Sequence, residues 1–307
     1  MRILFMGTPD IAAACLEELI ASEMEVVGAV SQPDRPKGRG HKLMPTDVKV
    51  TAQKHDIPVY QPEQLKNGEL MPVLEELKPD IIAVVAYGKI LPEYVLDFPK
   101  YGCINMHASL LPKLRGAAPI QWAVINGDKK TGVTTMLMDK GLDTGDILLS
   151  EEMEIGEYET AEELFERMAE RGGKILAETI KNIDKITPIA QEHEKHTYAP
   201  MLKKETAHID WNKSTDEISK LICGMNSWPM AFSYYKDEPM KIITARKGGC
   251  ASGENGEILG YEKGKGLRIK TSDGSIYIVT AQFPNSRKMD IEEYMRGHEL
   301  EIGTILK

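Results

Sequence analysis

An asparagine and a histidine two positions apart are the residues of this sequence best suited to chemistry. Asn105 lies in a strand predicted over residues 102–106, and His107 directly follows it. Because successive side chains of a strand point to opposite faces, these two share a face. An amide and an imidazole side by side can both donate hydrogen bonds to one oxyanion. A hydrogen-bonded pair inside the core is the alternative that the spacing leaves open.

A turn-rich segment further along the chain, 139–146, carries three carboxylates that could assist the pair. They are Asp139, Asp143 and Asp146. A carboxylate beside an imidazole favours the charged form of the ring. Aspartate is also common in turns for purely local reasons, so spacing alone does not choose among the three.

Strand and helix patterns alternate along the first half of the chain and should place these residues at one edge of a sheet. Helices are predicted over 9–20 (with Thr8 as N-cap and Pro9 at the first helical position), from residue 46, over 69–77 and over 161–183. Repeated β-α-β units predict an α/β fold with a Rossmann-like, mostly parallel sheet. Ligands of such sheets bind at the carboxyl ends of strands. The predicted strands are 2–6, 25–30, 58–60, 80–86, 102–106, 132–138 and 146–155.

The second half of the chain has a different pattern. Residues 185–205 are polar, contain Pro188 and Pro200, and indicate a linker. A helix over 215–225 and several short strands separated by Gly, Asn and Asp turns predict a small, OB-like β-barrel. We therefore expect a first domain at 1–184, a linker at 185–205 and a C-terminal β-barrel domain at 206–307. The predicted strands are 231–235, 240–245, 256–259, 267–270 and 275–280.

Composition excludes several classes of protein. The 307 residues are 42% apolar and 28% charged, which is typical of globular proteins. The longest apolar run, 81–87, is far shorter than the roughly 20 residues of a membrane span. Neither a dinucleotide fingerprint nor a P-loop is present, and His193 and His196 lack further ligands nearby, so we expect no metal site. Four cysteines without a CxxC pair and a start without a signal-peptide pattern favour the cytoplasm.

The charge of the chain is unevenly distributed. The net charge is −9, which argues against nucleic-acid binding by the molecule as a whole. Two stretches are nevertheless basic. Residues 241–288 hold nine Lys and Arg against four Asp and Glu, and residues 32–42 hold four against one. Such local zones decide whether a phosphate backbone can dock.

Several motifs resemble one family. Residues 109–120, SLLPKLRGAAPI, resemble the folate-loop signature of the formyltransferase family. Asn105-x-His107 matches that family's catalytic pair, and residues 141–146, GLDTGD, match the segment whose catalytic aspartate maps to Asp143. The opening residues 2–12 and the basic loop 32–40 resemble the branch that acts on methionyl-tRNA. The resemblance extends over essentially the whole chain, including the predicted barrel.

The resemblance implies formyl transfer from 10-formyltetrahydrofolate to the α-amine of methionine on initiator methionyl-tRNA. It implies that Asn105, His107 and Asp143 are catalytic and that no metal takes part. The folate co-substrate would contact Ser109, Leu110, Leu111 and Pro112, although plain core packing of the two leucines is an alternative. The domain at 1–184 would be the catalytic domain, and the tRNA would contact the C-terminal barrel at 206–307 and the basic residues of the loop. These are Arg35, Lys37, Arg39 and Lys42, in a protein expected to be monomeric and away from membranes.

Two other functions remain open from the sequence. Enzymes of the same chemistry that act on glycinamide ribonucleotide, on formyltetrahydrofolate itself or on amino sugars share an Asn, His and Asp set. A non-catalytic RNA-binding protein is a second alternative, against which the intact set argues. The basic loop and the basic C-terminal stretch favour tRNA over a small amine as the substrate.

A substitution in the basic loop tests the assignment to tRNA. We expect Arg39→Ala to raise the KM for tRNA or to lower kcat/KM, because it removes a cation from the phosphate-binding loop. Folate binding should be unchanged, since the loop lies outside residues 109–112. Steady-state kinetics with each substrate varied in turn measure both effects. Wild-type tRNA kinetics combined with weakened folate binding would contradict the assignment.

Overall fold

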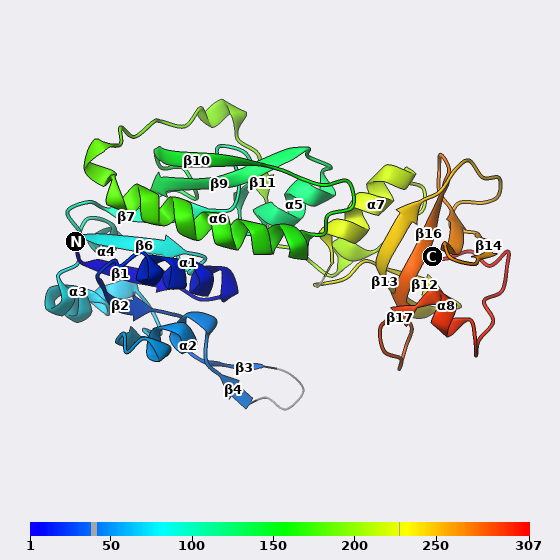
Figure 1. The fold of residues 1–307 in the computed structure, drawn as a ribbon, viewed down its shortest axis with the longest axis horizontal. Coiled ribbons are helices and arrows are strands. Elements are labelled where there is room, and N and C mark those ends of the chain that lie inside the picture. Colours follow the sequence, from blue (N-terminus) through cyan, green and yellow to red (C-terminus); the bar gives the residue numbers. More distant parts are fainter. Residues whose placement is uncertain (38–41, 227) are drawn as a thin grey trace. The chain divides into compact units, whose positions relative to one another are not determined.

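The chain folds into two compact units that do not follow the order of the sequence. The computed structural model describes residues 1–37, 42–226 and 228–307. The first unit comprises Met1–Ala117, Lys130–Glu154 and Phe165–Ala199. The second comprises Ala118–Lys129, Ile155–Leu164 and Pro200–Lys307. Figure 1 shows both units as ribbons coloured along the sequence.

A seven-stranded sheet forms the centre of the first unit. Five consecutive strands pair in parallel with one another. The two strands at the remaining edge pair antiparallel with their neighbours. The predicted mostly parallel α/β sheet is confirmed. The ends of each strand predicted for this half differ from those of an observed strand by two residues at most. In spatial order the strands are β10 (Ile147–Glu154), β9 (Lys130–Leu137), β7 (Cys103–His107), β6 (Ile81–Val85), β1 (Ile3–Gly7), β2 (Val26–Val30) and β5 (Val59–Tyr60).

Helices cover both faces of this sheet, because its central strands are apolar and buried at successive positions and not only at alternate ones. Leu4 and Met6 of β1 belong to one core cluster with residues of α3 (Met71–Leu77) and α4 (Glu93–Leu96). On the other face lie α1 (Asp10–Ala21) and α6 (Ala161–Lys181), as seen in Figure 1. Two glycines let α6 approach closely. A Cβ on Gly172 would lie 2.7 Å from Met106 Cε of β7, and one on Gly173 would lie 2.8 Å from Glu18 Cβ of α1.

The carboxyl ends of β1, β6 and β7 lie at the same edge of the sheet because these strands are parallel. At this edge the predicted cap of α1 is wrong. The N-cap residue is Pro9, without a side-chain cap bond. The Thr8 hydroxyl instead donates to the carbonyl oxygen of Tyr87, at 3.2 Å, and thereby ties the end of β1 to the turn after β6.

The segment predicted as a basic loop is partly a hairpin. Two short antiparallel strands, β3 (Arg35–Lys37) and β4 (Lys42–Met44), pair with each other and with no other strand of the described chain. The pairing of these two short segments overrides the loop character of the composition. The helix predicted from residue 46 is α2 (Asp47–Lys54), and its N-cap Thr46 accepts a hydrogen bond from the backbone of Lys49.

The second unit is an antiparallel sheet curled around a single apolar core. The fold class predicted for this half is confirmed. Ser214 caps the helix that begins at Thr215 with a complete capping box. The strands are β12 (Phe232–Tyr235), β13 (Glu238–Lys247), β14 (Ile258–Glu262), β15 (Gly266–Lys270), β16 (Ser275–Gln282) and β17 (Met289–Asp290), and the helices are α7 (Thr215–Gly224) and α8 (Ile291–Tyr294).

One helix from the first half of the chain belongs to this second unit. It is α5 (Pro119–Ile125), whose residues Trp122 and Ile125 pack against the core of the curled sheet. A Cβ on Gly224 of α7 would lie 2.4 Å from Ile125 Cγ1, so only glycine allows the two helices to approach this closely. The indole nitrogen of Trp122 donates to the carbonyl oxygen of Pro200 at 2.8 Å.

The glycine that ends β1 provides a test of this packing. A Cβ on Gly7 would lie 2.6 Å from Ala12 Cβ and 2.8 Å from the carbonyl oxygen of Val85, which cannot move without disturbing the sheet. We therefore expect Gly7→Ala to lower the free energy of unfolding by about 1–3 kcal/mol. Gly249→Ala is the matched control, since no atom lies within 4 Å of its added Cβ. Equal thermal midpoints for the two variants would contradict the expectation.

Candidate active site

Strand β7 places Asn105 and His107 in the middle of the sheet. Asn105 lies opposite Val84 of β6 and Met136 of β9, and His107 lies opposite Thr134 of β9. Asn105 is half-buried, whereas His107 is only 6% exposed. Met106, between them, points to the face that α6 covers. Alternation therefore directs both polar side chains to the opposite face, at the carboxyl edge.

The ring of His107 is held between a carbonyl group and a carboxylate. Its Nε2 atom lies 3.0 Å from the carbonyl oxygen of Leu114. A carbonyl oxygen can only accept, so Nε2 carries the hydrogen of this bond. Its Nδ1 atom lies 3.8 Å from Oδ2 of Asp143. That distance allows charge attraction but exceeds a hydrogen bond, so Nδ1 is not committed to the carboxylate.

Asp143 lies in the loop between β9 and β10 and has an unusual backbone. Its φ is 52°, in the left-handed region that residues other than glycine seldom adopt. The backbone N–H of Gly116 donates to its Oδ2 atom at 2.8 Å, and its side chain is only 12% exposed. The carboxylate is therefore fixed by a backbone donor and directed toward His107.

The other two aspartates of this loop have different roles. Asp139 Oδ1 accepts hydrogen bonds from the backbone of Gly141 at 2.9 Å and from the Thr144 hydroxyl at 2.6 Å. Asp146 is exposed. The structure thus brings Asp143 to His107 and gives Asp139 the turn-forming role that sequence patterns also allowed.

Residues 109–112 form a tight turn beside His107. The Ser109 hydroxyl donates to the carbonyl oxygen of Lys113 at 2.6 Å, so it closes the turn. The Thr134 hydroxyl donates to the Ser109 carbonyl oxygen and accepts from the backbone N–H of Leu111. Leu111 is buried, Leu110 and Pro112 are half-buried, and the Leu110 side chain lies against the backbone of Gly132. Contact of these residues with folate stays a prediction.

Three of the four basic residues predicted to bind tRNA lie in the two strands of the β3–β4 hairpin. Arg35 is exposed, and its guanidinium donates to Gln32 Oε1 at 3.4 Å. Lys37 and Lys42 are paired residues of β3 and β4. Arg39 lies outside the described residues. The base of the hairpin is held by Lys49, whose Nζ atom lies 2.6 Å from Asp34 Oδ2 and holds the pKa of that carboxyl below its usual range.

The basic stretch 241–288 carries less free charge than its composition indicates. Lys247 contacts Asp216 Oδ1 at 2.6 Å and Glu157 Oε1 at 3.2 Å. Arg287 contacts Glu293, at a distance of 2.5 Å. Lys265 and Arg268 both lie near Glu262. Acidic residues inside and outside the stretch therefore offset part of the excess that the sequence counts.

Gln191 is a buried residue that contacts the Asp143 loop and that no sequence pattern indicates. Its Nε2 atom donates to the carbonyl oxygens of Asp143 at 3.0 Å and of Gly145 at 2.7 Å. It lies in the polar stretch 185–205, which composition marks as a linker. No local pattern distinguishes one glutamine of such a stretch from its neighbours, so a fold was needed to find it.

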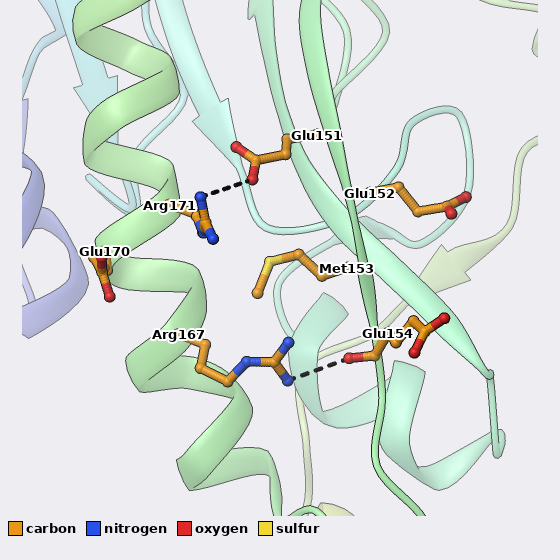
Figure 2. A pocket seen from close by; sticks show the side chains of 7 residues that line it. All are labelled: Glu151, Glu152, Met153, Glu154, Arg167, Glu170 and Arg171. Atoms are coloured by element: carbon orange, nitrogen blue, oxygen red, sulfur yellow. Dashed lines mark hydrogen bonds and ion pairs between the residues drawn. The ribbon is translucent and has the colours of Figure 1, made fainter.

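A hollow between β10 and α6 lies apart from these residues. Figure 2 shows its lining side chains, in which Arg171 reaches Glu151 Oε1 at 3.3 Å and Arg167 donates to the Glu154 carbonyl oxygen at 3.2 Å. Acidic and basic groups pair within it, and no candidate site residue lines it. Across the described residues, no group of three or more His, Cys, Asp or Glu could hold a metal ion.

The first unit is of the doubly wound α/β class, because its polar residues lie together at the carboxyl edge of an open sheet. Residues 1–180 match the family described as formyl transferase, and residues 201–299 match the formyl transferase C-terminal domain. The chain therefore belongs to the formyl transferase family.

Curated relatives match along the whole chain. A protein of Clostridium perfringens (strain 13 / Type A) named methionyl-tRNA formyltransferase is 50% identical over 311 residues, which cover 100% of both chains. A protein of the same name from Alkaliphilus oremlandii (strain OhILAs) is 48% identical, covering 100% of this chain and 99% of its own.

Solved structures are similar in fold. HypX from Aquifex aeolicus in complex with tetrahydrofolic acid has a TM-score of 0.66 at 18% identity, covering 99% of this chain and 50% of that one. An N-formyltransferase from Helicobacter canadensis, in complex with folinic acid and dTDP-3-aminofucose, has a TM-score of 0.64 at 20% identity, covering 94% of this chain and 99% of that one. At such identities the likeness concerns the fold alone.

Proposed function

We propose that this chain transfers the formyl group of 10-formyltetrahydrofolate to the α-amino group of methionine carried by initiator tRNA. The observation that carries the proposal is similarity along the whole chain, at 45–50% identity, to proteins named methionyl-tRNA formyltransferase. The meeting of Asn105, His107 and Asp143 at one sheet edge supports it, because formyl transfer passes through an oxyanion.

The reaction needs little base strength. The amine nitrogen attacks the formyl carbon, whose carbonyl oxygen becomes an oxyanion. The bond from that carbon to N10 of the folate then breaks, and the proton lost by the amine balances the one that N10 gains. A free α-amino group has a pKa of about 7.7–8.0, and the ester bond to tRNA lowers it further. Much of the nucleophile is therefore neutral at pH 7, and positioning matters most.

Asn105 and His107 would donate to the oxyanion. They share one face of β7, and Asn105 offers a neutral amide donor. His107 uses Nε2 for the carbonyl oxygen of Leu114, so Nδ1 is the ring atom left to face the reactants. Donors that are fixed before the reaction stabilise developing charge without reorganisation.

Asp143 would orient the His107 ring and favour its charged form, since the two groups lie 3.8 Å apart. Its carboxylate could also take the proton of the attacking amine, directly or through water. The backbone bond from Gly116 holds the carboxylate in place for either role.

The folate would bind beside this set, against Ser109, Leu110, Leu111 and Pro112. The turn that they form is closed by the Ser109 hydroxyl, which fixes the shape of this surface. Leu110 and Pro112 are half-buried and offer the apolar surface for a pterin or its linking arm.

The tRNA would bind the β3–β4 hairpin through Arg35, Lys37, Arg39 and Lys42. The exposure of Arg35 supports this role. We also propose the domain boundaries 1–184, 185–205 and 206–307, supported by the family matches at 1–180 and 201–299, and a monomer that acts in the cytoplasm. No helix of the described chain is long and apolar enough to cross a membrane.

A direct assay tests the function. The protein is incubated with 10-formyltetrahydrofolate and initiator methionyl-tRNA, and formyl-methionine is measured after the ester bond is hydrolysed. Parallel reactions contain glycinamide ribonucleotide or a dTDP-linked amino sugar. We expect formylation of the tRNA-bound amine alone. Formylation of a small amine without that of the tRNA would contradict the proposal.

Substitutions test the three catalytic residues. We expect Asn105→Ala, His107→Ala and Asp143→Asn each to lower kcat by about a hundredfold or more and to leave tRNA affinity nearly unchanged, because these groups act on developing charge. Asp146→Asn is the matched control from the same loop and should keep wild-type kcat. Near-normal turnover of one variant would remove that residue from the mechanism.

A further inference from the structure

Gln191 is buried at the centre of a hydrogen-bond network below the Asp143 loop. It is 5% exposed, and its side-chain carboxamide is fully used. The Nε2 atom donates to the carbonyl oxygens of Asp143 and Gly145, and Oε1 accepts from Nε of Arg115 at 3.2 Å and from Nη2 at 2.6 Å. Such a complete set of partners fixes the position of the amide group and determines which side its oxygen and its nitrogen face.

The backbone of the loop that Gln191 contacts has a conformation that other residues must stabilise. Asp143 has a positive φ, a conformation that is unfavourable for a residue with a Cβ and persists where its surroundings impose it. The two carbonyl groups that Gln191 binds lie on either side of Thr144. The amide therefore clamps the backbone directly at and after the strained residue.

Arg115 links this clamp to the other side of the site. Its neighbour Leu114 provides the carbonyl group bound to His107, and its neighbour Gly116 provides the N–H bound to Asp143. The Arg115 side chain is 6% exposed and also donates to His193 Nδ1 at 3.1 Å. One buried chain of contacts thus runs from the backbone that holds His107 to the backbone of Asp143.

We propose that Gln191 is a positioning residue, whose carboxamide holds the Asp143 loop so that the carboxylate faces His107. The inference rests on the proposed catalytic role of Asp143. It predicts an effect on the chemical step and little effect on substrate binding. It adds a residue from outside the matched catalytic motifs to the machinery of the site.

Backbone hydrogen bonds hold the segment around Gln191 on both sides. Ile189 and Ile147 exchange two backbone hydrogen bonds, at 2.8 and 2.9 Å. On the other side, β11 (Tyr198–Ala199) pairs in parallel with β8 (Arg115–Gly116). A substitution at Gln191 should therefore leave the segment in place and loosen only the loop above it.

Two variants separate the contacts of the amide. Gln191→Met keeps the length and removes every hydrogen bond. Gln191→Glu keeps an acceptor for Arg115 but turns a carboxylate toward the carbonyl oxygens of Asp143 and Gly145, which repel it. We expect both variants to lower kcat about tenfold or more, with the KM for each substrate changed less than about threefold. Gln64→Met, at an exposed glutamine of the same unit, should behave like the wild type.

The decisive measurement combines Gln191→Met with Asp143→Asn. If the glutamine acts through Asp143, its substitution should lower kcat less than about twofold in the Asp143→Asn protein. An equal loss in both backgrounds, or wild-type kcat in Gln191→Met and Gln191→Glu, would overturn the inference and leave the role of Asp143 intact. Wild-type kcat in Asp143→Asn alone would instead overturn the proposed catalytic role of Asp143, and the inference with it. Thermal midpoints of all variants identify any that do not fold, in which case Gln191→Glu replaces Gln191→Met.

Discussion

The arrangement of the site depends on three consecutive backbone positions, Leu114 to Gly116. The carbonyl group of the first orients His107, and the N–H of the third holds the Asp143 carboxylate. Between them, the Arg115 side chain reaches the glutamine that binds the Asp143 loop. Because these residues are consecutive, a shift of this short segment would move both titratable side chains together. Their mutual distance is therefore set by the backbone and not by the two side chains themselves.

Burial makes this arrangement effective. In a medium of low dielectric, fixed donors and carbonyl groups act more strongly than in water, and an unpaired polar group is costly. The guanidinium of Arg115 is held by Gln191 and by a ring nitrogen of His193. Because a guanidinium only donates, that ring nitrogen must be an acceptor. The orientations of the Gln191 amide and of the His193 ring are thereby constrained by Arg115.

The sequence predicted the strand part of the site better than its loop part. Alternation along β7 placed Asn105 and His107 on one face, and the parallel sheet placed them at the carboxyl edge. Asp143 could be selected only by family resemblance, since three aspartates had similar local patterns. Gln191 was missed because its partners are more than forty residues away and leave no periodic signal. Thr8 failed as a cap for the same reason, as its hydroxyl finds a partner in the turn after β6.

The position of α5 has a consequence for how the protein is made. The helix leaves the ribosome early, yet the core on which Trp122 and Ile125 pack consists of residues synthesised much later. Leu306 itself belongs to this core. At typical synthesis rates the apolar face of α5 waits about 10–40 s for its partners. During that interval this helix is a natural target for chaperones that hold apolar segments of nascent chains.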